Sequence, residues 1–339
     1  MIRRRMLGAL AAALSLGAAL SLAACNEKPS QVGGKPSEIT FGILPAENQA
    51  SMGPIWEPML ADLSKQIGVP VKARYVSNYA GLIEAMRFNQ AQMGWFSALP
   101  ALDAVQRANG EVLGRVIDAG GDETYKSVLI VKKGSGITLD KVLACGRRYS
   151  FGIGDPQSTS GTLAPMAYLF TPRRIDPTTC FSTVKSSSHQ ANAAAVANGV
   201  LDVATNNTVG LLFYKRDTPE IGNAVQVIWT SPPLPESSII VRKDLDPAIK
   251  EKLRQFFLTY GTAPGPDGDR QRAVLKRMAY GGFRPADDTY LDPVREMQAA
   301  VALAEARKSG DKARIAKAEA DFNRIHAQAE QKRAKDPNI

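Results

Sequence analysis

Short apolar runs alternate with helical patterns from the first third of the chain onward. The run over 39–44 has the length of a buried strand, and apolar residues at helical spacing follow over 59–67. The same patterns predict a strand over 69–75, a helix over 81–89 and a short strand over 93–96. This order predicts a βαβαβ unit, in which parallel strands form a sheet with helices on its faces.

A second unit with the same alternation follows. Its predicted elements are strands over 127–132, 150–153, 181–184, 203–205 and 225–229, and helices over 139–143, 162–170 and 190–198. A strand over 239–241 and a helix over 250–260 come next. From residue 292 the pattern predicts long charged helices, broken near Ser309 and Gly310. We therefore expect an α/β protein with two lobes and a helical C-terminal region.

The first 24 residues have the order of a secretory signal. Arg3, Arg4 and Arg5 precede an apolar run that ends in Leu-Ala-Ala-Cys, and residues 1–25 hold no acid. The last four of these residues resemble the bacterial lipobox, in which the cysteine becomes a lipid-carrying N-terminus, so lipidation of Cys25 is expected. The alternative is an ordinary signal with an incidental cysteine. Residues 26–37 are polar and rich in Gly, Pro and Ser, as in a flexible tether.

The net charge of +9 does not indicate a nucleic-acid partner. Three of the positive charges leave with the predicted signal, and half of the remaining excess lies in residues 305–336, where a charge run is typical of a solvated helix. No basic stripe interleaved with aromatic residues is visible.

Three cysteines occur in the chain. If Cys25 is lipidated, Cys145 and Cys180 remain in a protein that has crossed into an oxidising compartment, so a disulfide between them is expected. Two separate buried thiols are the alternative. We expect no metal, because only His189 and His326 could join the cysteines and no ligand spacing is present.

The segment 155–162, Asp-Pro-Gln-Ser-Thr-Ser-Gly-Thr, is the strongest candidate for a binding site. It lies between a predicted strand and a predicted helix, where amides of the first helical turn lack partners and three hydroxyls, on Ser158, Thr159 and Ser160, add further donors. This pattern suits phosphate, phosphonate, sulfate or carboxylate, although the same residues could merely cap the helix. His189 follows three serines at another strand-to-helix turn of the same lobe, and such turns gather along one edge of a parallel sheet.

Enzyme motifs are weak in this chain. Ser158, His189 and Asp202 would supply the residue types of a hydrolase triad, but no Gly-x-Ser-x-Gly elbow surrounds the serine. The phosphate loop, the dinucleotide fingerprint and the HExxH motif are also missing. A periplasmic phosphoester or ester hydrolase using Ser158 and His189 remains the alternative function.

Several ordered motifs between residues 38 and 292 resemble one family. They are Phe-Gly-Ile at 41–43, Tyr-Ala-Gly at 79–81 leading into Met-Arg-Phe-Asn at 86–89, Arg-Ala-Asn-Gly at 107–110, Ser-Val-Leu-Ile-Val at 127–131, Gly-Asp-Pro at 154–156 with Ser-Thr-Ser-Gly at 158–161, and Asp-Val-Ala-Thr-Asn-Asn-Thr at 202–208. Together they make the chain similar to the phosphonate-binding proteins of bacterial ABC importers.

The resemblance implies a type II periplasmic binding protein, with two Rossmann-like lobes joined by a two-strand hinge. The expected domains are a signal peptide over 1–24, a lipidated tether over 25–37, lobe 1 over 38–126 and 232–291, lobe 2 over 127–231, and C-terminal helices over 292–339. The hinge crossings are expected near 125–127 and 231–239. The expected role is capture of a phosphonate or related phosphorus oxyanion in the cleft, for delivery to a permease and an ATPase, without catalysis or cofactor.

The family resemblance assigns the ligand contacts by position. The Ser-Thr-Ser turn and the following histidine place the phosphorus group at Ser158, Thr159, Ser160 and His189, and two tyrosines from the other side of the cleft correspond to Tyr79 and Tyr125. The protein is expected in the periplasm, lipid-anchored to a membrane, and the C-terminal helices are a candidate surface for a homodimer.

The sequence departs from the family pattern at the tail of the ligand. Relatives that prefer an aminoalkyl phosphonate use two acidic residues, whose positions fall on Val209 and Ser237. Glu236 would substitute only if its loop shifted, and is expected to face solvent. Lys126 replaces an aromatic residue and either meets a second anionic group or points to water. These departures predict that a ligand amine is poorly favoured.

Overall fold

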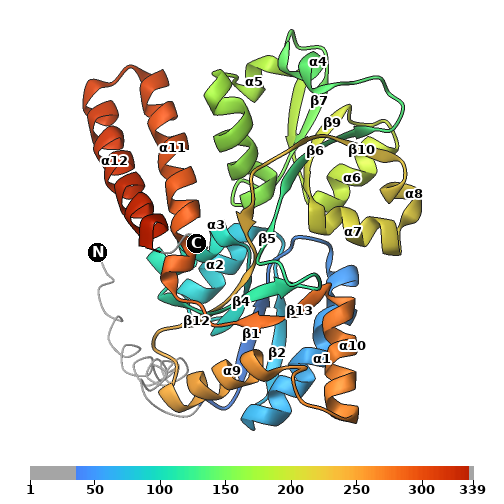
Figure 1. Ribbon diagram of the computed structural model, residues 1–339, viewed down its shortest axis with the longest axis vertical. Helices are drawn as coiled ribbons and strands as arrows, with labels where there is room; N and C mark the ends of the chain where they lie inside the picture. Colours follow the sequence, from blue (N-terminus) through green and yellow to red (C-terminus); the bar gives the residue numbers. More distant parts are fainter. Residues whose placement is uncertain (1–35, 336–339) are drawn as a thin grey trace, which may run out of the picture. The chain divides into compact units, whose positions relative to one another are not determined.

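The computed structural model describes residues 36–335 (Figure 1). The predicted signal, Cys25 and nearly all of the predicted tether lie outside the described residues. Within the described range, no helix combines the length and the apolar character needed to cross a membrane.

The first part of the chain builds most of one sheet and its helices. Its elements are β1 (Ile39–Ile43), α1 (Gln49–Ile67), β2 (Val71–Tyr75), α2 (Tyr79–Arg87), β3 (Met93–Phe96), α3 (Ala98–Arg107), β4 (Gly110–Asp118) and β5 (Thr124–Tyr125). The second part holds β6 (Ser127–Lys132), α4 (Leu139–Leu143), β7 (Ser150–Ile153), the π-helical turns η1 (Thr159–Leu163) and η2 (Met166–Phe170), the 3-10 turn η3 (Thr171–Arg173), α5 (Pro177–Cys180), β8 (Thr183–Ser186), α6 (His189–Ala197), β9 (Val203–Asn207), α7 (Thr208–Asp217), α8 (Pro219–Gly222) and β10 (Val225–Thr230).

The last part returns to the first sheet and then leaves it as helices. It comprises β11 (Leu234–Pro235), β12 (Ser238–Arg242), α9 (Pro247–Thr259), α10 (Pro266–Arg277), β13 (Tyr280–Arg284), the 3-10 turn η4 (Asp288–Leu291), α11 (Asp292–Ser309) and α12 (Lys312–Lys335).

The six-stranded sheet has the order β13-β4-β12-β3-β1-β2. Strand β1 pairs in parallel with β2 and β3, which confirms the predicted βαβαβ unit. Strand β12 inserts between β3 and β4 and runs antiparallel to both, although about 120 residues separate it from β4. The sheet is therefore mixed, and its centre is completed only when the chain returns from the second lobe.

The five-stranded sheet has the order β10-β6-β9-β7-β8. Strand β7 pairs in parallel with β8 and β9, whereas β6 runs antiparallel to β9 and β10. Phe151 in β7 stacks on Phe181 with ring centroids 4.4 Å apart, and Phe170 meets both rings edge-on. These three rings belong to the buried core of the second lobe.

Two neighbouring crossings join the sheets, which lie in the lower and upper halves of Figure 1. Strands β5 and β11 pair antiparallel. Beyond that pair, the Ser231 amide donates to the Ser127 carbonyl at 2.9 Å, and the Ser127 amide donates to Ser231 Oγ at 3.0 Å. The result is a two-lobed α/β fold of the type II binding-protein class, as the sequence predicts.

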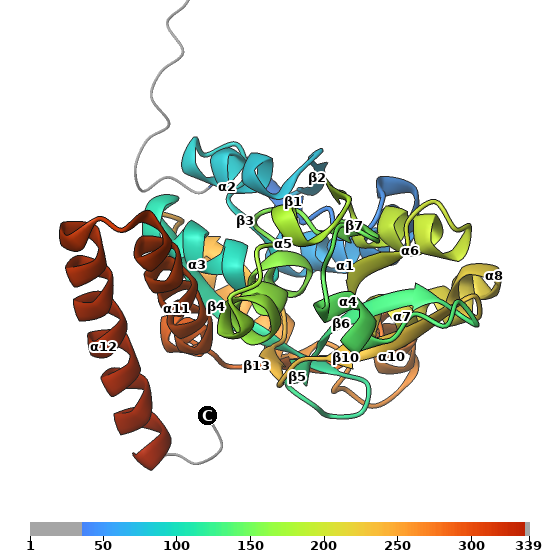
Figure 2. The same cartoon turned by 90° about the horizontal axis from the view of Figure 1, so that it is seen from above.

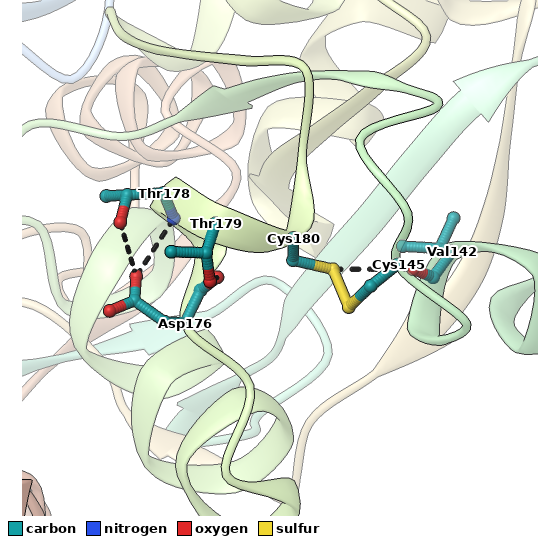
Figure 3. The surroundings of a disulfide bond; sticks show 6 residues. All are labelled: Val142, Cys145, Asp176, Thr178, Thr179 and Cys180. Carbon is teal, nitrogen blue, oxygen red and sulfur yellow. Dashed lines mark hydrogen bonds between the residues drawn. A yellow bond between two sulfur atoms is a disulfide. The ribbon is translucent and has the colours of Figure 1, made fainter.

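A disulfide joins Cys145, just after α4, to Cys180 at the end of α5, which confirms the expected pairing (Figure 3). The neighbouring Asp176 caps α5, because its Oδ1 accepts from the amide and the hydroxyl of Thr178. In the loop-entropy model, a closure spanning 35 positions in sequence restricts the unfolded chain by about 4 kcal/mol.

The two C-terminal helices pack against each other as an antiparallel pair (Figures 1 and 2). Helix α11 also contacts α3 of one lobe and η2 of the other, and it buries Val294, Met297 and Leu303. The predicted break is confirmed at Gly310, whose φ of 69° ends α11 in a left-handed cap.

Several predicted helices begin earlier than expected, and α1 shows the largest difference. Helix α1 starts at Gln49, because Asn48 caps it by accepting from the Ser51 amide at 2.9 Å. The helix contains Pro54 and Pro58. The segment predicted as a helix over 162–170 starts at Thr159 and consists largely of π-helical turns.

Candidate functional site

A cavity lies between the lobes and is lined by residues from both of them. Its volume is about 80 Å³, which is enough for a small ligand group. Ser158, Ser160 and His189 line it from the lobe of the five-stranded sheet, and Tyr79 lines it from the other lobe. Tyr125 lines it from the first crossing. The structure thus brings together five of the six residues predicted to contact the ligand.

The hydroxyl groups of the cavity come from the turn after β7. Ser158 caps η1, since its Oγ accepts from the Gly161 amide at 2.9 Å. Close approach of Gly154 to Gly161 shapes this turn: a Cβ on Gly154 would lie 2.6 Å from Gly161 Cα. We call Ser158, Ser160 and His189 the cradle.

His189 is the first residue of α6, and Ser188 caps that helix. Its Nε2 lies 3.4 Å from both Ser158 Oγ and Ser160 Oγ. Its Nδ1 is buried and has no hydrogen-bond partner in the described protein. Burial lowers the pKa of His189 to about 4, so the imidazole is neutral at pH 7 and the cradle carries no formal charge.

Tyr79 and Tyr125 are buried beside the cradle. Burial raises the pKa of both phenols, so both keep their protons at neutral pH. The Ser158 hydroxyl opposes this rise at Tyr79, and the Ser160 hydroxyl opposes it at Tyr125. The phenol groups of Tyr79 and Tyr125 are therefore neutral hydrogen-bond donors that face the hydroxyl groups of the cradle.

Thr159 does not line the cavity, unlike the serines on either side of it. Its Oγ1 accepts from the Leu99 amide at 2.8 Å and lies 3.3 Å from Ser97 Oγ, at the start of α3 in the other lobe. The Tyr79 amide likewise donates to Asp155 Oδ2 at 3.3 Å. The middle residue of the Ser-Thr-Ser motif thus holds the lobes together.

Three of the four positions expected to set ligand specificity line the cavity, and the fourth does not. Val209, Ser237 and Glu236 all line the cavity, whereas Lys126 is exposed and lies outside it. The expectation that Glu236 faces solvent is wrong, because the residue is only 5% exposed. The pairing of β5 with β11 and the start of β12 enclose it, although its Pro-rich and Ser-rich surroundings are typical of an exposed loop.

Several cavity residues escaped the sequence analysis. They are Glu47 after β1, Trp56 in α1, Trp95 in β3, Phe213 in α7 and Tyr280 at the start of β13. Only Glu47 had a usable signal, since a polar residue that follows a buried parallel strand lies at the edge where ligands bind. The aromatic residues are indistinguishable from core positions in the sequence.

The hydrolase triad considered from the sequence is not assembled. The Asp202 carboxylate accepts from the amide and the hydroxyl of Ser150, both at 2.8 Å, and not from His189. Within residues 36–335, no group of three or more His, Cys, Asp and Glu side chains is placed to hold a metal ion.

Two mixed sheets, two crossings and a cavity between the lobes define the class of two-lobed substrate-binding proteins. The family model for periplasmic phosphonate substrate-binding proteins of ABC transporters matches residues 41–291. The chain belongs to this family and is the periplasmic substrate-binding component of a phosphonate or phosphate ABC importer.

Similar proteins agree with this assignment. The phosphonates-binding periplasmic protein of Escherichia coli K12 is 40% identical over 270 residues, which cover 79% of this chain and 78% of the relative. A binding protein of an ABC phosphonate transporter from Pseudomonas aeruginosa has a TM-score of 0.82 and 34% identity, covering 88% of this chain and 99% of its own. A Prochlorococcus marinus protein in complex with methylphosphonate has a TM-score of 0.69 and 20% identity, covering 78% of this chain and 97% of its own. At that identity the similarity supports the fold alone.

Proposed function

We propose that the cavity captures a phosphonate or related phosphorus oxyanion, with its oxygens on Ser158, Ser160 and His189. The observation that carries this proposal is the meeting of two buried hydroxyls and a neutral imidazole at one point, each hydroxyl 3.4 Å from His189 Nε2. Neutral donors in a desolvated site bind an oxyanion through charge-assisted hydrogen bonds. Tyr79 and Tyr125 close the opposite side of the phosphorus group.

The proposed capture step uses closure of the lobes. Lobe 1 is assigned to residues 38–126 and 232–291 and lobe 2 to 127–231, in keeping with the membership of the two sheets. Thr159 takes part in this step through its bond to Leu99 in the other lobe. The closed form delivers the ligand to the permease and the ATPase of the importer.

The remaining parts of the proposal concern the ends of the chain. Cys25 carries a lipid that anchors the mature protein to a membrane, as the lipobox-like residues before it indicate. The C-terminal helices form a homodimer contact, since α12 packs on α11 and leaves much of its own surface exposed.

Calorimetry on the purified protein tests the ligand. Phosphate, phosphite, methylphosphonate and 2-aminoethylphosphonate are titrated in parallel into the natural protein and into Ser158→Ala. We expect at least one phosphonate to bind stoichiometrically, and Ser158→Ala to weaken it about 10-fold to 100-fold, the value of a hydrogen bond to a charged group.

Thr183→Ala is the matched control, because it removes an exposed hydroxyl from β8 of the same lobe. Absence of binding, or equal affinity in Ser158→Ala and the natural protein, would contradict the proposal. Turnover of a phosphoester or ester that depends on Ser158 would instead support the hydrolase alternative.

A further inference from the structure

A groove adjoins the cavity at the boundary between the two lobes, and we call it the boundary groove. Its other lining residues come chiefly from α1 and α10 of the first lobe and from α6 and α7 of the second (right side of Figure 1). The residues that line both the groove and the cavity are Glu47, Met52, Ile55 and Phe213. The two spaces are therefore neighbours that share one wall.

The boundary groove lies where the lobes separate when they open. Two hydrogen bonds cross the boundary beside it, from the Tyr214 hydroxyl to Glu47 Oε1 at 2.7 Å and from Arg216 Nη1 to the Arg277 carbonyl at 3.0 Å. None of the residues that line the groove belongs to the two crossings. Since the lobes turn about the crossings, opening breaks these bonds and exposes the cavity on this side.

The boundary groove carries positive charge, whereas the cavity has no cation. Among residues 36–335, no lysine or arginine lines the cavity, but Arg216, Lys276 and Arg277 line the groove. A hydrogen bond from Arg216 lowers the pKa of Asp217, which is therefore ionised at pH 7. Burial raises the pKa of Glu47 to about 8, so this carboxyl group mostly keeps its proton. Three cations in the groove thus oppose one ionised carboxylate.

Helix α10 leads from the boundary groove to the cavity. Lys276 and Arg277 belong to its last turn, and both side chains are exposed. The next residue, Met278, caps the helix and lines the cavity. An anion that enters through the groove therefore passes both cations before it reaches the cradle.

The neutral cradle explains why cations are useful at this place. Hydroxyl groups and a neutral imidazole bind an oxyanion at hydrogen-bond distance, but they exert little attraction from afar because they carry no net charge. Cations at the mouth of a cleft raise the local concentration of an anionic ligand and its association rate.

We infer that the boundary groove is the entrance through which the oxyanion reaches the cradle, and that Lys276 and Arg277 accelerate its capture by long-range attraction. The inference rests on the proposed function of the cradle. It assigns to these two residues the rate of association and leaves the rate of dissociation to the cradle and the contacts between the lobes. Arg216 differs from them, because Asp217 balances its charge and its guanidinium holds the closed lobes together.

Stopped-flow fluorescence measures the rate of capture, because Trp56 and Trp95 line the cavity. Phosphate, phosphite, methylphosphonate and 2-aminoethylphosphonate are each mixed with the natural protein and with a variant that carries Lys276→Gln and Arg277→Gln. At about 10 mM ionic strength, the association rate should fall about 5-fold in the variant while the dissociation rate stays within about 2-fold. At about 0.5 M the difference in association rate should shrink below about 1.5-fold, because salt screens exposed charges.

The double variant leaves the closed form intact, because the bond from Arg216 uses the main-chain carbonyl of Arg277. Calorimetry at the same two ionic strengths should therefore give affinity ratios that match the ratios of the association rates. Glutamine is chosen because it removes the charge and keeps a good helix former at the end of α10.

Two further variants separate the boundary groove from the rest of the protein. A control with Lys312→Gln and Lys317→Gln removes the same charge from exposed positions of α12, outside the groove, and should leave the association rate within about 1.5-fold. Arg216→Gln removes the bond to the Arg277 carbonyl. It should raise the dissociation rate and lower the association rate less than the double variant does.

Other results overturn the inference. An unchanged association rate in the double variant would do so. Equal slowing by the α12 control would assign the effect to net charge, and slowing that persists at high salt would assign it to packing of Lys276 and Arg277. If none of the four ligands binds the natural protein, the proposed function fails and the inference with it. Binding that depends on Ser158 but not on these two cations overturns the inference only.

Discussion

The two sides of the cavity are built in different ways. The cradle comes from one turn after β7 and from the first residue of α6, so all of its groups belong to one lobe. The opposite wall takes one to three residues from each of six segments: the β1–α1 loop, α1, β3, α7, the second crossing and β13. The group shared by all candidate ligands is thus held by a local motif, whereas the parts that differ between ligands meet a wall assembled by tertiary packing.

The sides also differ in charge. The cradle offers neutral hydroxyls and a neutral imidazole, and the wall offers aromatic surface with two carboxyl groups. Changes in the cradle should therefore affect every phosphorus oxyanion, and changes in the wall should affect chosen ligands or the stability of the empty protein.

The largest effect is expected from Gly154→Ala. The added Cβ would lie 2.6 Å from Gly161 Cα and 2.9 Å from its carbonyl carbon, and backbone atoms cannot move aside cheaply. Displacing Ser158 and Ser160 together should weaken every phosphonate by about 100-fold, measured by calorimetry. Gly120→Ala is the control, because its Cβ would meet only the Asp118 side chain. Affinity within twofold of the natural value would show that the turn is not held by this approach.

A smaller effect is expected from Glu47→Gln on stability. The pKa of Glu47 is raised from 4.5 to about 8 in the folded protein, so the folded state holds this proton to higher pH than the unfolded chain does. The stabilisation of the folded state by the protonated Glu47 carboxyl is complete below pH 4.5 and is lost as the pH rises to 8. The natural protein should therefore lose roughly 1–3 kcal/mol of unfolding free energy relative to Glu47→Gln between these values.

Urea denaturation of both proteins without ligand, at pH 5 and at pH 9, measures this difference. Glu57→Gln, at an exposed glutamate of α1, serves as the control. A difference between natural protein and Glu47→Gln that stays constant with pH would show that Glu47 titrates as an exposed group.

The smallest effect concerns the charge of His189. In the empty cavity its pKa is about 4, and a bound oxyanion should raise it, because the anion stabilises the imidazolium. The natural protein should bind the ligand more tightly than His189→Gln does, and the ratio of the two affinities should be greatest near pH 5 and fall by about tenfold toward pH 8. Calorimetry across this range measures the ratio, with His326→Gln on α12 as the control. A ratio independent of pH would mean that His189 stays neutral in the complex.

The sequence predicted the cradle better than the wall, for a physical reason. Ser158, Ser160 and His189 follow strands at helix starts, where short-range geometry already aims them at one edge of the sheet. Glu236 was misjudged because its burial depends on β11 pairing with β5, more than 100 residues earlier in the chain. The pattern of three hydroxyls does not show that the middle one, on Thr159, accepts from the Leu99 amide in α3, so that bond was not predicted.

The same difference applies to the fold: strands with a local hydrophobic pattern were predicted, and strands that depend on long-range pairing were not. Periodicity predicted the parallel core strands β1, β2 and β3 and the boundaries of β6 and β7. Strands β4 and β13 were not predicted, since Gly114 interrupts the first and two adjacent glycines weaken the second. Their pairing with each other and with β12 creates them as strands, and that pairing is a property of the folded chain.

Ser127 has one more consequence for how the protein moves. Its amide and carbonyl both bond to Ser231, and its Oγ donates to the Ser160 carbonyl at 2.6 Å. These three hydrogen bonds link the two crossings to each other and to the turn that carries Ser158 and Ser160. A rotation of one lobe about the crossings should therefore displace the hydroxyl groups of Ser158 and Ser160 as well, which couples the angle between the lobes to the geometry of the cradle.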